Sequence, residues 1–206
     1  MINDLKSLSN YTCRMGEKLP ALKNEIVLKS PGISQSDYAR LTSSLPNLPE
    51  SYLKCIQSVD VKGVSIGYFR LWPRAVKADN LVEGLVKMNA PEKNPLWHFL
   101  REKGFYEVAA WEAEPICVAT KKSSQEEGSV LKISIAQPSL KENLLAPNFE
   151  TFLLIAGNLD AIRGKHSKTG DRASASAEFE DCLVYFALPG EAVIAWKGIS
   201  GVVFST

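Results

Sequence analysis

One pair of neighbouring segments constrains the fold of this chain most: a strictly alternating stretch and, shortly after it, a helix with a single apolar stripe. Residues 129–135 alternate, with Leu131, Ile133 and Ile135 on one face and Val130, Lys132 and Ser134 on the other. From Pro147 the apolar residues recur at helical spacing, and the stripe consists of Phe149, Phe152, Leu153, Ala156, Leu159 and Ile162. A period of two indicates a β-strand, and a period near 3.6 indicates a helix. We therefore predict a sheet with one covered face, on which this helix lies.

Further strands and helices precede this pair. Residues 106–110 and 116–121 are expected to be strands, and a polar, glycine-containing turn follows the second of them. Before these strands, we expect a short helix capped by Ser34 or Ser36 and a second helix from Glu50 to about Val59. A β-rich run then begins at Val64 and ends at Trp72-Pro73, and two helical pieces follow within 79–104. The apolar run 178–186 is too dense to show a period, so both a helix and a strand stay open there.

These segments together predict an α+β fold, with a central, mostly antiparallel sheet and helices packed on one face. The length fits one domain, and nothing in the sequence requires a second. Residues 1–206 are thus expected to divide into a core at 33–164, an N-terminal extension or short hairpin at 1–32, a helical insertion at 79–104, and a C-terminal tail at 165–206 that packs on the core.

Charge and hydropathy restrict the classes of partner. The chain has 24 Lys and Arg against 23 Asp and Glu, so the long-range attraction that drives non-specific binding to nucleic acids or anionic membranes is missing. The N-terminal residues are polar and lack the apolar region of a secretory signal, which favours a cytoplasmic location. Because Pro189 and Lys197 interrupt the apolar stretch Leu183–Phe204, no membrane span is expected there.

Metal binding and cofactor binding are not expected from the sequence. The cysteines are scattered among apolar neighbours without CxxC spacing, which favours buried, reduced thiols; they are Cys13, Cys55, Cys117 and Cys182. The two histidines, His98 and His166, have no second ligand at metal spacing.

A catalytic alternative depends on residues 63–67, which match the G-x-S-x-G pattern of a nucleophile elbow with Ser65 at its centre. The elbow requires a strand before the serine and a helix after it, whereas here a helix precedes and a β-like run follows. An ordinary glycine-flanked strand is therefore favoured. A small hydrolase would need Ser65, or a cysteine, to meet a histidine such as His166 and an acidic residue in one cleft. Near that histidine, Gly164 is expected to cap the preceding helix.

An acidic and aromatic stretch lies among the predicted strands. Glu107, Glu112 and Glu114 surround Trp111, and two further glutamates follow in the next turn. The simpler interpretation is a solvated strand edge, where charges discourage aggregation. The sharper hypothesis is an aromatic anchor flanked by carboxylates, which suits a basic partner such as the nucleic-acid-binding face of a nuclease. Its candidate partner-binding residues are Trp97, Trp111, Glu112, Glu114, Glu126 and Glu127, with Trp72 and Trp196 as further possible anchors.

Three parts of the chain together resemble the SUKH superfamily, which includes the fungal Smi and Knr cell-wall-synthesis regulators and many bacterial immunity proteins. Within 33–56, the sequence Leu48-Pro49-Glu50-Ser51-Tyr52-Leu53 is similar to the entry of the family's second helix. Residues 114–119 with 128–133 resemble its central pair of strands, and 145–153 resembles the helix that follows its sheet. The order and spacing of the three parts agree with the family.

The resemblance implies an immunity protein of a bacterial polymorphic-toxin or contact-dependent inhibition system, which binds a cognate toxin domain, often a nuclease, and blocks it. Such a protein needs only a complementary surface of roughly 800 Å² per partner with a few anchors, so no catalytic site of its own is expected. The alternative within the same fold is an intracellular scaffold or regulator that binds other proteins. The motifs transfer no toxin-binding residue and leave the oligomeric state open.

Overall fold

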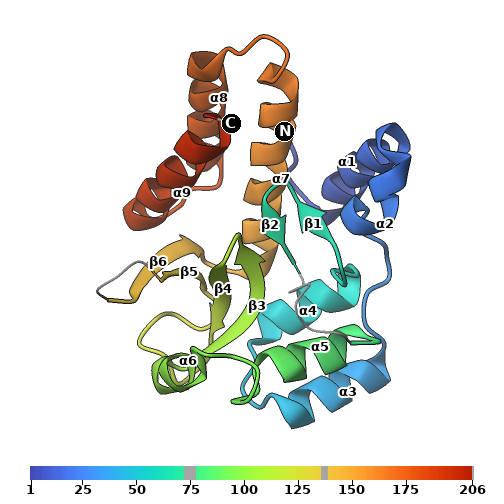
Figure 1. Ribbon diagram of the computed structural model, residues 1–206, viewed down its shortest axis with the longest axis vertical. Coiled ribbons are helices and arrows are strands. Elements are labelled where there is room, and N and C mark those ends of the chain that lie inside the picture. Colours follow the sequence, from blue (N-terminus) through green and yellow to red (C-terminus); the bar gives the residue numbers. More distant parts are fainter. Residues whose placement is uncertain (72–77, 136–138, 206) are drawn as a thin grey trace.

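The computed structural model describes residues 1–71, 78–135 and 139–205 (Figure 1). The helices are α1 (Leu5–Lys18), the short 3₁₀ helix η1 (Pro20–Leu22), α2 (Lys23–Ile26), α3 (Gln35–Ser44), α4 (Glu50–Ser58), α5 (Leu81–Met88), α6 (Trp97–Lys103), α7 (Phe149–His166), α8 (Arg172–Tyr185) and α9 (Gly190–Val203). The strands are β1 (Ser65–Ile66), β2 (Phe69–Arg70), β3 (Phe105–Trp111), β4 (Glu114–Ala119), β5 (Val130–Ser134) and β6 (Lys141–Ala146). The long helix α7 runs through the middle, with α1 and α2 on one side and α8 and α9 on the other.

Within the described residues, the strands form one antiparallel sheet in the order β1-β2-β3-β4-β5-β6. The three predicted strands correspond to β3, β4 and β5, and the α+β class with an antiparallel sheet is confirmed. The sequence does not predict β6, because its first residues are polar and only Leu145 and Ala146 are buried. The two predicted short helices and both helical pieces within 79–104 are present as α3, α4, α5 and α6.

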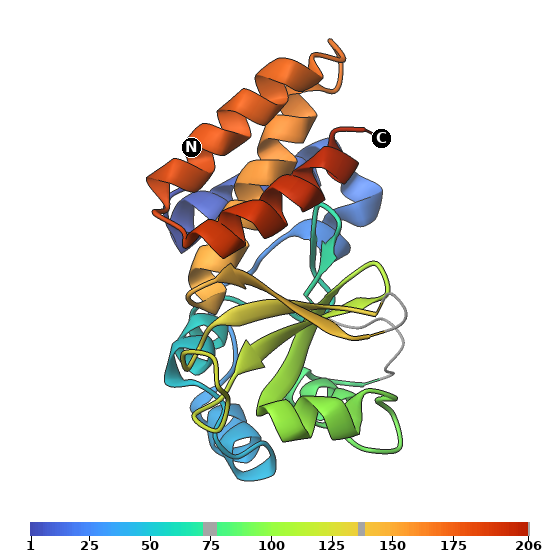
Figure 2. The ribbon, with the colours of Figure 1, turned by 90° about the vertical axis from the view of Figure 1, so that its left-hand side faces the viewer.

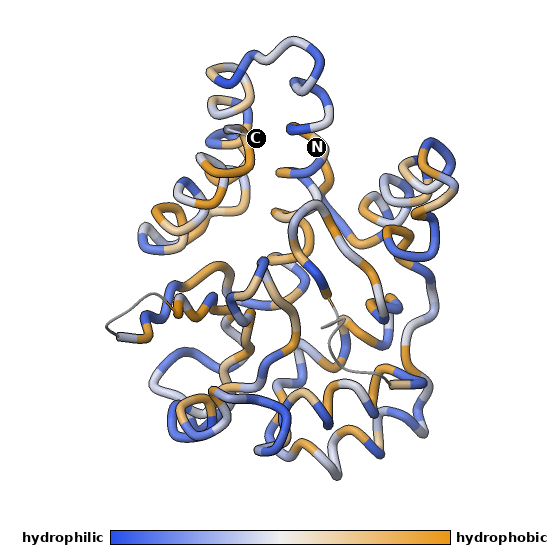
Figure 3. Tube along the Cα trace, viewed as in Figure 1, coloured by the Kyte–Doolittle hydropathy of each residue, from blue (hydrophilic) through white to orange (hydrophobic). Residues whose placement is uncertain are grey.

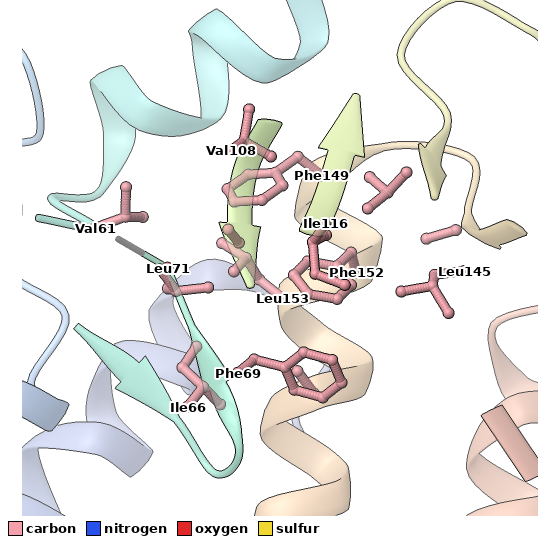
Figure 4. Close-up of a cluster of buried hydrophobic side chains, with 14 of the residues drawn as sticks. Val61, Ile66, Phe69, Leu71, Val108, Ile116, Leu145, Phe149, Phe152 and Leu153 are labelled. Atoms are coloured by element: carbon pink, nitrogen blue, oxygen red, sulfur yellow. The ribbon is translucent and has the colours of Figure 1, made fainter. Parts of the chain in front are cut away.

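Helix α7 lies on one face of the sheet, as its apolar stripe predicts (Figure 4). The side chain of Asn148 caps the helix and accepts a hydrogen bond of 2.9 Å from the backbone N–H three residues later. Phe149 and Phe152 are fully buried in one cluster with Val108 and Ile116 of the sheet. This cluster is the centre of the hydrophobic core.

Part of the opposite sheet face is covered as well. Phe105, Leu131 and Ile133 pack there against Leu100 of α6, whereas Val130 belongs to the cluster on the α7 face. The alternation predicted for this strand is therefore present, and it buries apolar residues on both sides of the sheet. The prediction of one covered sheet face is correct for the face under α7, but α6 covers part of the other face as well.

Val64 to Leu71 forms a tight hairpin instead of the single strand that the sequence predicts. The two-residue strands β1 and β2 pair with each other, and Gly67 between them has a φ of +56°, which favours glycine. A Cβ at this glycine would lie 3.2 Å from a carboxylate oxygen of Asp160 on α7. Trp72 and Pro73, where the run was expected to end, lie outside the described residues.

Most of the first twenty-six residues are helical, so the hairpin alternative for the N-terminal extension is wrong. The buried positions of α1 are Leu8, Thr12 and Gly16, of which two are not apolar. This composition explains why the segment shows no apolar period. Leu8 packs so closely on α7 that a Cβ at Gly157 would lie 2.4 Å from its Cδ1.

The segment left open at 178–186 is helical up to Tyr185, since these residues belong to α8. After a short turn, α9 packs against β6 and inserts Trp196 into the core. Trp196 is fully buried, and its indole N–H donates a hydrogen bond of 2.7 Å to the carbonyl of Leu145. In the described parts of the chain, no helix combines the length and apolar content needed to cross a bilayer.

Gly164 does not cap α7, contrary to the expectation. The helix continues past it, and Ser167 is its C-terminal cap residue. The left-handed conformation comes later in the connection, at Gly170 with a φ of +65°. Gly164 therefore lies within the last turn of α7.

One hydrophobic cluster extends from Ile2 to Phe204. The segments expected to be an extension and a tail both contribute buried side chains to it. The division of the chain into a core, an extension, an insertion and a tail itself stays a prediction.

Candidate functional site

Trp111, the predicted anchor, is buried in the sheet, with the ammonium of Lys132 over its ring. It pairs in register with Glu114, and only 9% of its surface is exposed. The ammonium of Lys132 lies 4.4 Å from the centre of the indole ring and 2.5 Å from the Glu114 carboxylate. This ion pair neutralises Glu114 within its own chain, so neither residue is displayed as the sequence suggests. The indole N–H has no hydrogen-bond partner among the described residues.

Glu112 lies at the tip of the β3–β4 turn, where its side chain is exposed. Its φ of +54° is unusual for a residue with a side chain and belongs to the tight turn between the strands. The carbonyl oxygen of Glu112 accepts a hydrogen bond of 2.6 Å from the guanidinium of Arg70. The turn is therefore fixed to β2, and the carboxylate stays accessible to a partner.

Glu126 and Glu127 are also exposed, but they lie at the other end of β4. The loop that carries them closes through a backbone hydrogen bond from Gly128 to Ala119, the last residue of this strand. Because a strand rises by about 3.3 Å per residue, roughly 17 Å of β4 separates this loop from the β3–β4 turn. The accessible carboxylates thus form two separate groups.

The other tryptophans do not join these carboxylates. Trp97 is partly exposed on α6, which covers the opposite sheet face, and its ring contacts that of His98 edge-on. Trp196 is part of the core. Trp72 lies outside the described residues.

No hydrogen bond joins Ser65 to a histidine in the parts of the chain that the structure describes. Ser65 lies in the β1–β2 hairpin, whereas His166 contacts Glu178 at 2.9 Å. Burial raises the pKa of Cys55 and Cys182 to about 12 and raises that of Cys117 well above its usual value. These three thiols therefore stay protonated at neutral pH and are poor nucleophiles. Among the residues that the structure describes, no group of three potential metal ligands occurs.

Glu107, expected within the acidic surface, faces the covered side of β3 instead. Its carboxylate accepts a hydrogen bond of 2.7 Å from the side chain of Asn94, and its backbone is held on both sides by Asn89. Burial raises the pKa of this carboxyl to about 7. Glu107 is therefore a partly covered group that holds the α5–α6 connection to the sheet.

Apolar side chains face solvent on the outward side of α8 and α9, a surface that was not predicted from the sequence. Val184 is 78% exposed and Ile194 is 73% exposed, more than any other large apolar residue described. A groove of about 180 Å³ lies between the two helices and is lined by Glu180, Leu183, Val184, Ala187, Leu188, Val193 and Lys197. One feature of the sequence could have indicated this surface: residues 190–203 contain only one acidic and one basic residue.

No family model, curated protein or solved structure matches this chain. The resemblance to the SUKH superfamily therefore stays a prediction.

Proposed function

We propose that this chain is a cytoplasmic immunity protein that binds a cognate bacterial toxin domain and neutralises it. The observation that carries this proposal is the packing of the three segments on which the SUKH resemblance depends. Tyr52 of α4 meets Phe149 of α7 edge-on, with ring centres 4.9 Å apart. Gly128, before β5, lies so close to α4 that a Cβ there would be 2.6 Å from the hydroxyl of Ser51. Segments far apart in the sequence thus form one packed unit, which supports a common structural role for them.

The accessible carboxylates fit a partner with a basic surface. Glu112, Glu126 and Glu127 are exposed, and no ion pair with them occurs among the described residues. The two groups are about 17 Å apart along β4, whereas an interface of standard size is roughly 30 Å across. One basic partner can therefore contact both groups, as a nuclease would with the surface that binds nucleic acid.

The test is to co-express the chain with the toxin domain encoded beside its gene. Survival of the cells, together with co-purification of the two proteins, is the expected result. If no toxin is encoded nearby, or the two proteins neither bind nor protect the cells, immunity is wrong and the scaffold alternative is favoured.

A charge-reversal variant then locates the interface. Glu112, Glu126 and Glu127 are changed together to lysine, and the control changes the exposed residues Glu17, Glu92 and Glu102 in the same way. We expect the first variant alone to bind the toxin at least about tenfold more weakly at low salt, because rim charges mainly set the association rate. Equal affinity of both variants, with protection retained, would place the toxin on another surface and leave the immunity function standing.

A further inference from the structure

The outward side of α9 exposes large apolar side chains to solvent. In Figure 2, α9 lies in front, and no other element passes over it. The core takes one side of the helix, with Ala192, Trp196, Ile199 and Val203. On the other side, Ile194 is 73% exposed and Val202 is 46% exposed. An apolar face of a helix is normally packed against another element, so this side lacks a cover.

The shape of this side allows close approach of another helix. Gly198 and Gly201 follow Ile194 at four and seven residues, which places all three on one face, here called the α9 stripe. A Cβ at either glycine would meet no atom within 4 Å. The helical backbone is therefore bare along the last two turns of the stripe.

The charges beside the α9 stripe are arranged for pairing with an identical helix. Hydrophilic and hydrophobic positions interleave along the two C-terminal helices in the hydropathy colouring (Figure 3). Glu191 lies three residues before Ile194 and Lys197 lies three residues after it. At 100° per residue, these two residues are about 60° to either side of Ile194. One edge of the stripe is thus acidic and the other is basic.

We propose that α9 is the interface of a homodimer, in which a second copy of this chain covers the α9 stripe. A two-fold axis parallel to the helix places Ile194 against its counterpart and lets the two backbones approach at Gly198 and Gly201. The same axis exchanges the edges, so Glu191 of each copy faces Lys197 of the other, in the way that flanking charges pair parallel coiled coils. Lys197 also contacts Glu180 of its own chain at 2.9 Å, so it would bridge two carboxylates.

The size of the surface indicates a weak dimer. A helix of fourteen residues is about 21 Å long, so one helix with its flanks buries less than the roughly 800 Å² per partner of a standard interface. Association is therefore expected in the micromolar range and is independent of any toxin. It goes beyond the proposed function, since either can fail while the other holds.

The experiment is sedimentation equilibrium of the isolated full chain over a concentration series that extends to several hundred micromolar. The wild-type mass is expected to rise with concentration from that of the 22.7 kDa monomer towards twice that value. Ile194→Glu removes the central apolar contact and sets two carboxylates against each other, so the dissociation constant should rise by more than about thirtyfold. The control is Leu22→Glu, at a residue that is 44% exposed far from α9 in the sequence, and it should leave the dissociation constant unchanged.

A charge exchange separates the proposed pairing from a general loss of structure. Glu191→Lys or Lys197→Glu alone should weaken association by about tenfold. The double exchange should bind more tightly than Lys197→Glu alone, although the carboxylate at position 197 then lies beside Glu180 of its own chain. A wild type that stays monomeric throughout, or a double exchange that is as weak as Lys197→Glu alone, would overturn the proposal. A monomeric wild type whose Ile194→Glu variant loses toxin binding would likewise overturn it and assign the α9 stripe to the toxin.

Discussion

Helices α7 and α9 are both rich in apolar residues, but the rest of the chain covers them very differently. Ten of the eighteen residues of α7 are buried, against five of the fourteen in α9. Helices α1, α4 and α8 and strands of the sheet contact α7 from several directions, whereas α9 contacts mainly β6 and α8. Apolar composition thus indicates that a helix needs a cover, and only the packing shows how much of that cover the chain itself provides.

The largest expected effect contrasts the two sides of α9. Trp196→Ala should lower the free energy of unfolding by about 4 kcal/mol, because it leaves a cavity in the core and removes the hydrogen bond to Leu145. Ile194→Ala, on the exposed side, should lower it by less than about 0.5 kcal/mol. Urea denaturation at a protein concentration where the chain is monomeric measures both values. If Trp196→Ala does not fold, Trp196→Phe should still lose about 1 kcal/mol more than Ile194→Ala. Similar losses at both positions would mean that the monomer covers α9 on both sides.

The sequence predicts the elements whose apolar positions keep a regular period. Residues 129–135 and the stripe of α7 show such periods, and both elements form as expected. In α1 the period is hidden because Thr12 and Gly16 occupy buried positions. Gly67 divides another run into two short strands, which depends on a backbone conformation and not on hydropathy.

The candidate site was harder to predict, because exposure depends on contacts between distant residues. Whether Glu114 is free depends on Lys132, which is 18 residues away and meets it only in the register of β4 with β5. The same limit applies to Glu107, whose partner Asn94 belongs to the α5–α6 connection. Glu126 and Glu127 were placed correctly in an exposed turn, since turns are usually solvated.

The second-largest effect is expected in the pH dependence of stability, where Glu107 should behave differently from exposed glutamates. Burial keeps Glu107 protonated up to about pH 7 in the folded chain, whereas a free carboxyl of this type loses its proton near pH 4.5. Between these values the folded chain holds more protons than the unfolded chain, so this contribution to stability is complete below pH 4.5 and is lost as the pH rises through 7. The loss should amount to about 3 kcal/mol.

Glu107→Gln should remove this pH dependence and keep an oxygen that accepts the Asn94 hydrogen bond. The measurement is the difference between the wild-type and variant unfolding free energies at pH 5 and pH 8. Glu17→Gln, at an exposed position, is the control and should keep the wild-type change in unfolding free energy between pH 5 and pH 8. If Glu107→Gln keeps the same change in unfolding free energy between pH 5 and pH 8, other groups cause the pH dependence.

A smaller loss of unfolding free energy is expected for Gly157→Ala, at the contact between α7 and α1. The added methyl group would lie 2.4 Å from Cδ1 of Leu8, so the buried side chain of α1 must move. Overpacking of this kind costs about 1–3 kcal/mol, which the better helix preference of alanine partly offsets, leaving a net loss of about 1 kcal/mol. Thermal and urea unfolding measure it. The double variant Gly157→Ala with Leu8→Ala should show the two losses to be non-additive, because the second change removes the atom that clashes.

The smallest change in stability, and the only increase, is expected for Gly198→Ala in α9. No atom lies within 4 Å of the added Cβ, and alanine favours a helix interior over glycine by about 0.5–1 kcal/mol. The variant should therefore be more stable by about that amount when it is compared in an Ile194→Glu background, where the dimer is absent. In the wild-type background the same methyl group should weaken association, since it separates the two backbones where they approach. A gain in monomer stability together with a loss of association belongs to an interface residue, whereas a loss of both would mean that the chain itself already packs against this side of α9.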